Sequence, residues 1–346
     1  MGRPERRLDA GVSCGGPDWL IVGQGLAGTC LAWRLWKRGV PFRIADDGAG
    51  GSSLVAAGLI NPITGKNFEP SHGLAIHQPE STAFYQDVET RNGRRVWHAM
   101  PVLRLASGEN EWRKIESKLD REDIRPWISD SRPDIPSGPW RGAVELRGGG
   151  RLDTVSFLHG SRDFFEARGV MLRERVDPDH AHGRTVWCEG AAGILRGGCG
   201  PHRCAKGEIL TLRAEGFDET RIRIGAGGWL VPIGGECFKA GATYEWENLD
   251  REPTAEGRRR VEEIATRLMG RDFEVIAHEA GIRPILRRSD PLLARLSDGS
   301  WVFNGLGSKG SLYAPGVADR LAMWMLEGRE PDERLRYRTL PCPPGS

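Results

Sequence analysis

The sequence predicts an α/β protein in which a parallel-sheet domain is interrupted by a mainly antiparallel β domain with helices. Two observations place the parallel sheet at both ends of the chain: a strand, a glycine-rich turn and a helix follow one another over residues 18–47, and the same order returns over residues 301–326. A third observation is that most segments between these units have the short, β-branched or aromatic composition of strands. The 346 residues are enough for two interleaved domains with cores of their own.

The first unit has the pattern of a dinucleotide-binding turn. Four apolar residues, WLIV, predict a buried strand, and Gly23, Gly25 and Gly28 follow in the spacing GxGxxG. The first glycine permits a tight turn, the second lets a diphosphate approach bare backbone, and the third lets the helix pack closely on the strand. The helix that begins near Leu26 and Ala27 offers amide groups and a positive dipole to the phosphates. The unit therefore predicts a Rossmann-like domain.

An acidic residue at the end of the second strand completes this pattern. Asp46 ends the segment VPFRIAD, where its carboxylate can accept hydrogen bonds from ribose hydroxyls. Asp47 is the alternative acceptor, but Asp46 continues the alternation of Phe42 and Ile44, and this favours Asp46. FAD and NAD both fit this first unit.

The segment after the second strand does not continue with the further βα units of an NAD dehydrogenase. Residues 48–68 are instead rich in small side chains, which let the backbone lie against a large flat ligand. The cofactor-contacting residues that we expect in this segment are Ser52, Ser53, Ala57 and Gly58.

The remaining elements follow from hydrophobic periodicity. Helices are expected over residues 79–90 and 154–169. Strands are expected around residues 97–106, 142–150, 185–191, 206–214, 227–234 and 237–246. The resulting division assigns residues 18–75, 150–205 and 281–330 to a discontinuous cofactor-binding domain, residues 76–149 and 206–280 to a substrate-binding domain, residues 1–17 to a disordered extension and residues 331–346 to a tail.

The second glycine turn predicts that the ligand extends beyond a diphosphate. Its amides can meet the edge of a flavin ring, and the following helix N-terminus can stabilise negative charge on a reduced flavin. We therefore expect FAD, and the absence of cysteine in the turn predicts non-covalent binding. A purely structural role for the turn is the alternative. The residues assigned to FAD here are Gly305, Gly307, Ser308, Lys309 and Gly310.

Several motifs in this order resemble those of the D-amino-acid oxidase/glycine oxidase superfamily of FAD-dependent amine oxidoreductases. The motifs are IVGQGLAG, Asp46, SSLVAAGLINP, KGE, LVPIGGECFKAGATYEW, AGIRP and FNGLGSKGSLYAP. The chain is also similar to the flavin oxidase half of the bifunctional tRNA wobble-uridine methylaminomethyl enzymes, mainly through GLGSKG and GATY. The resemblance covers about residues 18–330 and is poorly specific for substrate.

Three residues are the candidates for catalysis. Arg283 is held in a rigid position before Pro284, where it can fork a substrate carboxylate; the resemblance implies this role, and a surface salt bridge is the alternative. The resemblance also places Trp229 in the substrate pocket, with core packing as the alternative, and leaves Tyr244 undecided in the same way. In the sarcosine oxidase branch a lysine equivalent to Lys239 faces the flavin and promotes reaction with oxygen; a solvated strand lysine is the alternative.

The predicted activity is FAD-dependent oxidation of the C–N bond of an amino-acid-like primary or secondary amine to the imine, by hydride transfer to flavin N5, with oxygen as the reoxidant. Lys309 departs from the aromatic residue or histidine common in the family turn, so the substrate preference does not follow from the resemblance. The alternatives are an oxidoreductase acting on a carboxymethylamino group of modified tRNA and a non-enzymatic flavin-binding module.

Charge and cysteine usage set the expected partners and compartment. Lys and Arg number 49 against 47 Asp and Glu, a net charge of +2, which gives no electrostatic case for nucleic acid or an acidic membrane. No apolar run is long enough to cross a bilayer. The seven scattered cysteines do not form a disulfide framework, and neither CGPHRC at 199–204 nor DPDHAH at 177–182 is expected to bind a metal. We therefore expect a cytoplasmic enzyme acting on a small amine.

Overall fold

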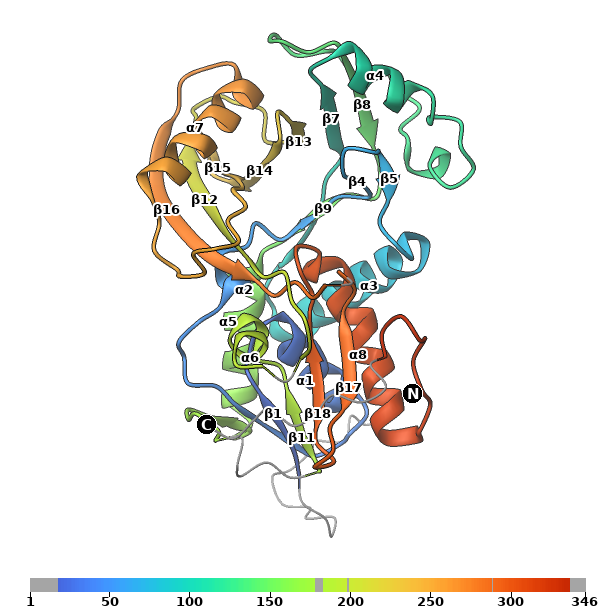
Figure 1. Ribbon diagram of the computed structural model, residues 1–346, viewed down its shortest axis with the longest axis vertical. Coiled ribbons are helices and arrows are strands. Elements are labelled where there is room, and N and C mark those ends of the chain that lie inside the picture. The colour runs from blue at the N-terminus through green and yellow to red at the C-terminus, as the bar shows by residue number, and fades with distance from the viewer. Residues whose placement is uncertain (1–17, 178–182, 198, 288, 337–346) are drawn as a thin grey trace, which may run out of the picture.

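The computed structural model describes residues 18–177, 183–197, 199–287 and 289–336. Figure 1 shows two lobes, a lower one built on the first strand and the last helix and an upper one that contains most of the chain's middle. The predicted extension at 1–17, most of the DPDHAH loop and the end of the predicted tail lie outside the described residues.

The lower lobe is built on a six-stranded sheet in the order β10-β2-β1-β11-β18-β17. Its first five strands run parallel, and β17 joins the edge in the antiparallel direction. Parallel strands buried on both faces are mostly apolar, which is why WLIV is recognisable in the sequence. FRIA follows the same rule at Phe42, Ile44 and Ala45, while Arg43 is exposed. The strands are β1 (Trp19–Val22), β2 (Phe42–Ala45), β10 (Met171–Leu172), β11 (Thr185–Trp187), β17 (Leu292–Arg295) and β18 (Trp301–Asn304).

Four helices surround this sheet and share one core with it. They are α1 (Leu26–Lys37), α3 (Leu74–Asn92), α5 (Thr154–Glu166) and α8 (Gly310–Glu327). The helix α8 packs against both α1 and α3, and the Tyr85 hydroxyl donates a hydrogen bond to the Ser311 carbonyl at 2.8 Å. The sequence division placed residues from 76 onward in the other domain, so α3 is a difference from that expectation. The sequence of α3 indicates a helix with an apolar face, but this face packs on α8, which is more than 200 residues later in the chain.

The upper lobe is a seven-stranded, mainly antiparallel sheet in the order β16-β12-β15-β14-β13-β7-β8, with one parallel pair between β13 and β7. Helix α7 (Ala255–Met269) packs against β12, β14 and β15, and α4 (Glu109–Glu116) lies at the other end of the sheet near β7. The strands are β7 (Val102–Ala106), β8 (Gly142–Leu146), β12 (Ala205–Arg213), β13 (Ile222–Gly225), β14 (Gly228–Gly234), β15 (Cys237–Gly241) and β16 (Glu274–Arg283). Together the two sheets confirm the predicted fold class.

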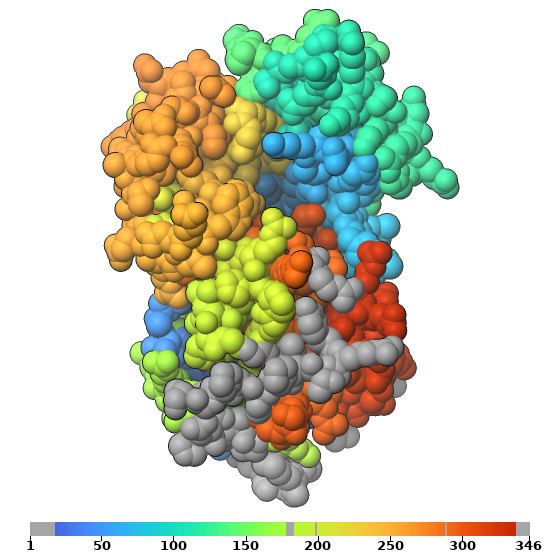
Figure 2. All heavy atoms as spheres, in the orientation of Figure 1, coloured from blue at the N-terminus to red at the C-terminus, as the bar shows by residue number. Residues whose placement is uncertain are grey.

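Short elements connect the two lobes. β3, β9 and β6 form a three-stranded sheet in that order, and β9 lies between the lobes in Figure 1. The β4-β5 hairpin lies beside β7 and β8 in the upper lobe. In Figure 2 the segments that contain α7 (orange) and α4 (teal) both lie at the upper end of the molecule. The remaining short elements are α2 (Ser52–Val55), β3 (Leu59–Ile60), β4 (Ile63–Thr64), β5 (Glu69–Pro70), β6 (Trp97–Ala99), a 3₁₀ turn (Arg125–Trp127), β9 (Gly150–Leu152) and α6 (Gly190–Leu195).

The beginning of the predicted tail packs on the lower sheet. The Leu293 amide donates to the Leu335 carbonyl at 2.7 Å, beside β17. Among the described residues, no helix is long and apolar enough to cross a membrane.

Candidate active site

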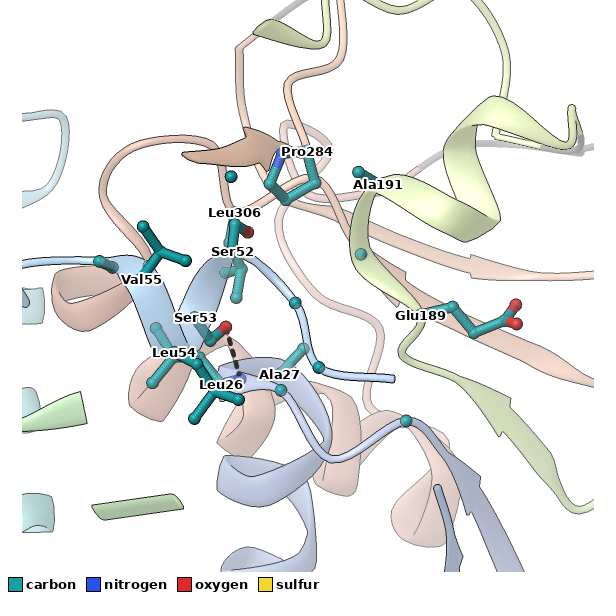
Figure 3. Close-up of a pocket in the computed structure, with 18 of the residues that line it drawn as sticks. Leu26, Ala27, Ser52, Ser53, Leu54, Val55, Glu189, Ala191, Pro284 and Leu306 are labelled. Atoms are coloured by element: carbon teal, nitrogen blue, oxygen red, sulfur yellow. Dashed lines mark hydrogen bonds between the residues drawn. The ribbon is translucent and has the colours of Figure 1, made fainter. Parts of the chain in front are cut away.

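An elongated cavity of about 590 Å³ joins the two lobes. It is lined by the first glycine turn, the end of β2, α2, the second glycine turn and the facing ends of β14 and β16. Figure 3 shows α2 and the start of α1 on one side of the cavity and Ala191 and Glu189 across from them. Of the residues predicted from the sequence, those lining the cavity are Gly23, Gly25, Leu26, Ala27, Asp46, Ser52, Ser53, Ala57, Gly58, Gly307, Ser308, Gly310, Trp229 and Arg283. The other predicted residues are not part of the lining: Gly28, Lys239, Gly305 and Lys309.

The first glycine turn is too tight for side chains at two of its three glycines. Gly23 has φ +99°, and a Cβ there would lie 2.7 Å from the Cys188 carbonyl oxygen. A Cβ on Gly28 would lie 1.9 Å from the Gly23 carbonyl oxygen, so this residue allows the helix to approach the strand. At Gly25 the only atom within contact distance of a Cβ is the Ser53 hydroxyl, at 3.3 Å. Bare backbone therefore faces the cavity at Gly25.

The helix α2 is fixed against this turn. Ser53 Oγ accepts a hydrogen bond from the Leu26 amide at 3.2 Å, as the dashed line in Figure 3 shows. On its other side α2 packs on β16, where a Cβ on Gly281 would approach Ser52 Cα to 3.2 Å. Small residues in this segment therefore let α2 lie between the two lobes, along the cavity wall.

Asp46 lies at the cavity end of β2 and accepts three hydrogen bonds. Its Oδ2 accepts from the Gln24 amide at 2.8 Å, and its Oδ1 accepts from the Gly48 amide at 3.0 Å and from Arg162 Nη2 at 2.8 Å. Arg162, on α5, also lines the cavity and was not predicted. Nothing in the local pattern of α5 could have identified it, because its partners are more than 100 residues earlier in the chain.

The second glycine turn leads into the N-terminus of α8. The Gly307 amide donates to the Pro284 carbonyl at 3.0 Å, which links this turn to the segment that carries Arg283. The Lys309 side chain leaves the turn and donates to Thr64 Oγ1 at 3.2 Å. Burial lowers the pKa of Lys309, an effect that the nearby Asp290 carboxylate partly opposes.

Arg283 brings a positive charge into the cavity. Its Nη1 donates to the carbonyl oxygens of Thr243 at 3.1 Å and Lys206 at 3.5 Å, and its Cζ lies 4.2 Å from the centre of the Tyr244 ring. Among the described residues no carboxylate lies within ion-pair distance of it, and burial lowers its pKa with Tyr244 opposing the shift. An arginine remains protonated nonetheless, so the cavity holds a guanidinium that can accept an anion.

Gly207, on the neighbouring strand β12, leaves space for the Arg283 guanidinium. Gly207 on β12 pairs with Gly281 on β16, and a Cβ on Gly207 would lie 2.1 Å from Arg283 Nη2. The motif KGE contains this glycine, but only the pairing of β12 with β16 reveals its function.

Two aromatic residues accompany Arg283. Trp229 is half-buried, lines the cavity and pairs with Gly241, where a Cβ would lie 2.7 Å from its ring. Tyr244 also lines the cavity but is 46% exposed, and its ring stacks on that of Trp246 at 5.9 Å. Tyr244 therefore lies at the cavity mouth.

Lys239 lies behind α2 instead of on the cavity surface. Its Nζ donates to the Val55 carbonyl at 2.8 Å, and the Glu279 carboxylate is 3.6 Å away. Burial lowers the pKa of Lys239, and Glu279 partly opposes this effect. Val55 itself lines the cavity, so the ammonium is separated from the cavity by the backbone of α2.

The residues present fit an FAD. The glycine backbone at α1, the carboxylate at the end of β2 and a second turn at α8 surround one continuous cavity, which extends from Asp46 to Arg283. Fold and site together define a dinucleotide-binding oxidoreductase with a second, mainly antiparallel lobe.

The chain belongs to the family of FAD-dependent oxidoreductases named DAO, whose model matches residues 18–324. Its cofactor is FAD, as expected from the two glycine turns.

Sequence relatives come from two groups within this family. The tRNA 5-methylaminomethyl-2-thiouridine biosynthesis bifunctional protein of Caulobacter vibrioides is 25% identical over 371 residues, which cover 96% of this chain and 59% of that protein. The glycine oxidase of Pseudomonas aeruginosa is 27% identical over 130 residues, which cover 36% of this chain and 35% of that enzyme. The chain spans between 52% and 59% of the length of the bifunctional relatives.

Solved structures share the whole fold. The iminodiacetate oxidase from Chelativorans sp. BNC1 has a TM-score of 0.75 at 20% identity and covers 94% of this chain and 99% of its own. The glycine oxidase from Geobacillus kaustophilus has a TM-score of 0.73 at 20% identity, covering 91% of this chain and 95% of its own. At these identities the likeness establishes the fold.

Proposed function

We propose that this protein oxidises the C–N bond of an amino-acid-like primary or secondary amine to the imine. The observation that carries this proposal is Arg283: a half-buried guanidinium in the FAD cavity with no carboxylate partner among the described residues. Burying a charge without a partner is costly, so such a residue is retained where a ligand supplies the partner. The carboxylate of an amino acid is a ligand of that kind.

Orientation is the main contribution of the protein to this chemistry. When bound, FAD supplies the acceptor for the hydride of the substrate carbon. Arg283 holds the substrate carboxylate by two parallel hydrogen bonds, and Trp229 forms part of the wall beside it. Fixing one end of a small substrate converts the reaction into an effectively intramolecular one. The amine binds in its neutral form, and no side-chain base is needed.

Anaerobic bleaching of the flavin tests this proposal. Purified protein is mixed without oxygen with a panel of amino acids, N-methyl and N-carboxymethyl amino acids, and the matching amides. We expect acids to bleach the flavin absorbance and amides to do so far more slowly, because an amide cannot form the ion pair with Arg283. Equal rates with acids and amides would refute the assignment.

A second candidate acts on a carboxymethylamino group of modified tRNA. The relatives named for tRNA 5-methylaminomethyl-2-thiouridine biosynthesis favour it, since one of them aligns with 96% of this chain. The same guanidinium could bind the carboxylate of such a group. Incubation with tRNA that carries the modification, followed by nucleoside mass spectrometry, tests it directly. The near balance of charge, 49 basic against 47 acidic residues, favours the small amine.

Oxygen is the oxidant that we propose for the second half of the reaction, and Lys239 is the residue that we propose to assist it. Its ammonium lies one backbone segment behind the cavity wall at Val55, where it can stabilise negative charge across α2. Free thiols at Cys30, Cys188, Cys199, Cys204 and Cys237 favour a reducing compartment, and we propose the cytoplasm.

A further inference from the structure

We propose that Arg162 is an adenosine-binding residue that acts together with Asp46. Arg162 enters the cavity from α5. Its hydrogen bonds connect this helix to the first glycine turn and to the end of β2, two segments that are distant from α5 in the chain. This inference concerns the binding affinity for the cofactor, so a negative result would not contradict the proposed amine oxidation.

The contacts of Arg162 fix the carboxylate of Asp46. Arg162 Nε donates to Gln24 Oε1 at 2.5 Å, and its Nη2 donates to Asp46 Oδ1 at 2.8 Å. Gln24 is itself 6% exposed and held by a bond from its Nε2 to the Leu158 carbonyl at 3.1 Å. Arg162 is therefore attached to a rigid group on each side, and it cannot turn without releasing Asp46.

Asp46 alone has little capacity left for a ribose. A carboxylate offers about four acceptor positions, and protein donors already occupy three of those on Asp46. It can therefore take about one further hydrogen bond, which is one ribose hydroxyl. The base and the remaining ribose oxygens of an adenosine therefore need another hydrogen-bond partner.

Arg162 supplies that partner. A guanidinium has five N–H donors, and only two of those on Arg162 have acceptors among the described residues. Its side chain is 28% exposed and lines the cavity next to Asp46, which is 18% exposed. The free donors suit the acceptors of adenosine, which are N1, N3 and N7 of the base and the ribose oxygens, while the carboxylate accepts a hydrogen bond from a ribose hydroxyl. The pair lies at the end of β2 beside the first glycine turn, where a dinucleotide fold places the adenosine half of its cofactor.

Half-molecules of the cofactor test this inference. Apoprotein is titrated calorimetrically with FAD, with ADP, which lacks the flavin, and with FMN, which lacks adenosine. For Arg162→Ala we expect the Kd of FAD and that of ADP to rise by a common factor of about 10 to 100, the scale of losing one or two charge-assisted hydrogen bonds. The Kd of FMN should stay at the wild-type value. Arg162→Lys keeps the charge but loses the fork, so it should recover only part of the ADP affinity.

A matched variant separates binding from stability. Asp163 is the neighbour of Arg162 on α5, and its carboxylate lies 2.7 Å from Arg94 Nη2. Neither Asp163 nor Arg94 lines the cavity. Arg94→Ala should leave all three affinities unchanged. An unchanged ADP affinity in Arg162→Ala would overturn the proposal, as would an equal weakening of ADP and FMN, which indicates a structural role. If Arg162→Ala does not fold, the same comparison of ADP with FMN in Arg162→Lys decides the matter.

Discussion

Adding one methyl group at Gly207 should displace Arg283 and leave the fold intact. A Cβ at this position would lie 2.1 Å from Arg283 Nη2 and 2.3 Å from its Cζ. The nearer atom must retreat from 2.1 Å to the 3.4 Å at which ordinary contact begins, a shift of about 1.3 Å. The clash involves the far end of a flexible side chain, so Arg283 moves and the β12–β16 backbone does not. A displacement of about 1 Å at a positioning group costs about 100-fold in rate.

The assay for Gly207→Ala is steady-state and anaerobic kinetics on the best amino-acid substrate. We expect kcat/KM to fall about 100-fold, while flavin occupancy and the melting temperature remain close to wild type. Gly108→Ala is the matched control, because a Cβ at Gly108 meets nothing within 4 Å and the residue has φ −136°. The reasoning is wrong if Gly207→Ala keeps its kcat/KM, or if it loses flavin and stability in proportion to activity.

Three further predictions follow from the same cavity. Gly25→Val should place a branched side chain where the diphosphate approaches bare backbone, and the purified protein should be colourless; full flavin occupancy would contradict the assignment. Arg283→Lys should raise KM with a normal flavin spectrum, because the charge remains but the fork is lost, and equal activity on acid and amide would argue for another role. Lys239→Met should leave anaerobic flavin reduction intact and slow reoxidation by air about 100-fold in stopped-flow measurements; unchanged reoxidation would leave Lys239 as a support for α2 through Val55.

The parts of the fold that the sequence predicted are those with a local signal. The strand, turn and helix over 18–47 form one continuous pattern, and β1, α1 and β2 appear within it. The division into domains was less accurate at α3, because amphipathic periodicity shows that a helix has a buried face but not which core it joins. Helix α7 was not predicted at all, although Thr254 caps it through a bond to the Gly257 amide at 2.9 Å.

The residues of the site also fall into two groups, those with a local signal in the sequence and those that depend on long-range pairing. Gly23, Gly25 and Asp46 could be assigned because a diphosphate imposes their spacing on a single short segment. The space for Arg283 depends instead on Gly207, a residue 76 positions earlier that becomes its neighbour only through the register of β12 against β16. That register is set by long-range pairing, so a single sequence contains no local trace of it. The clearest evidence for a substrate carboxylate is a half-buried guanidinium that has no acidic partner among the described residues and for which Gly207 leaves space. This evidence therefore exists only at the level of the folded chain.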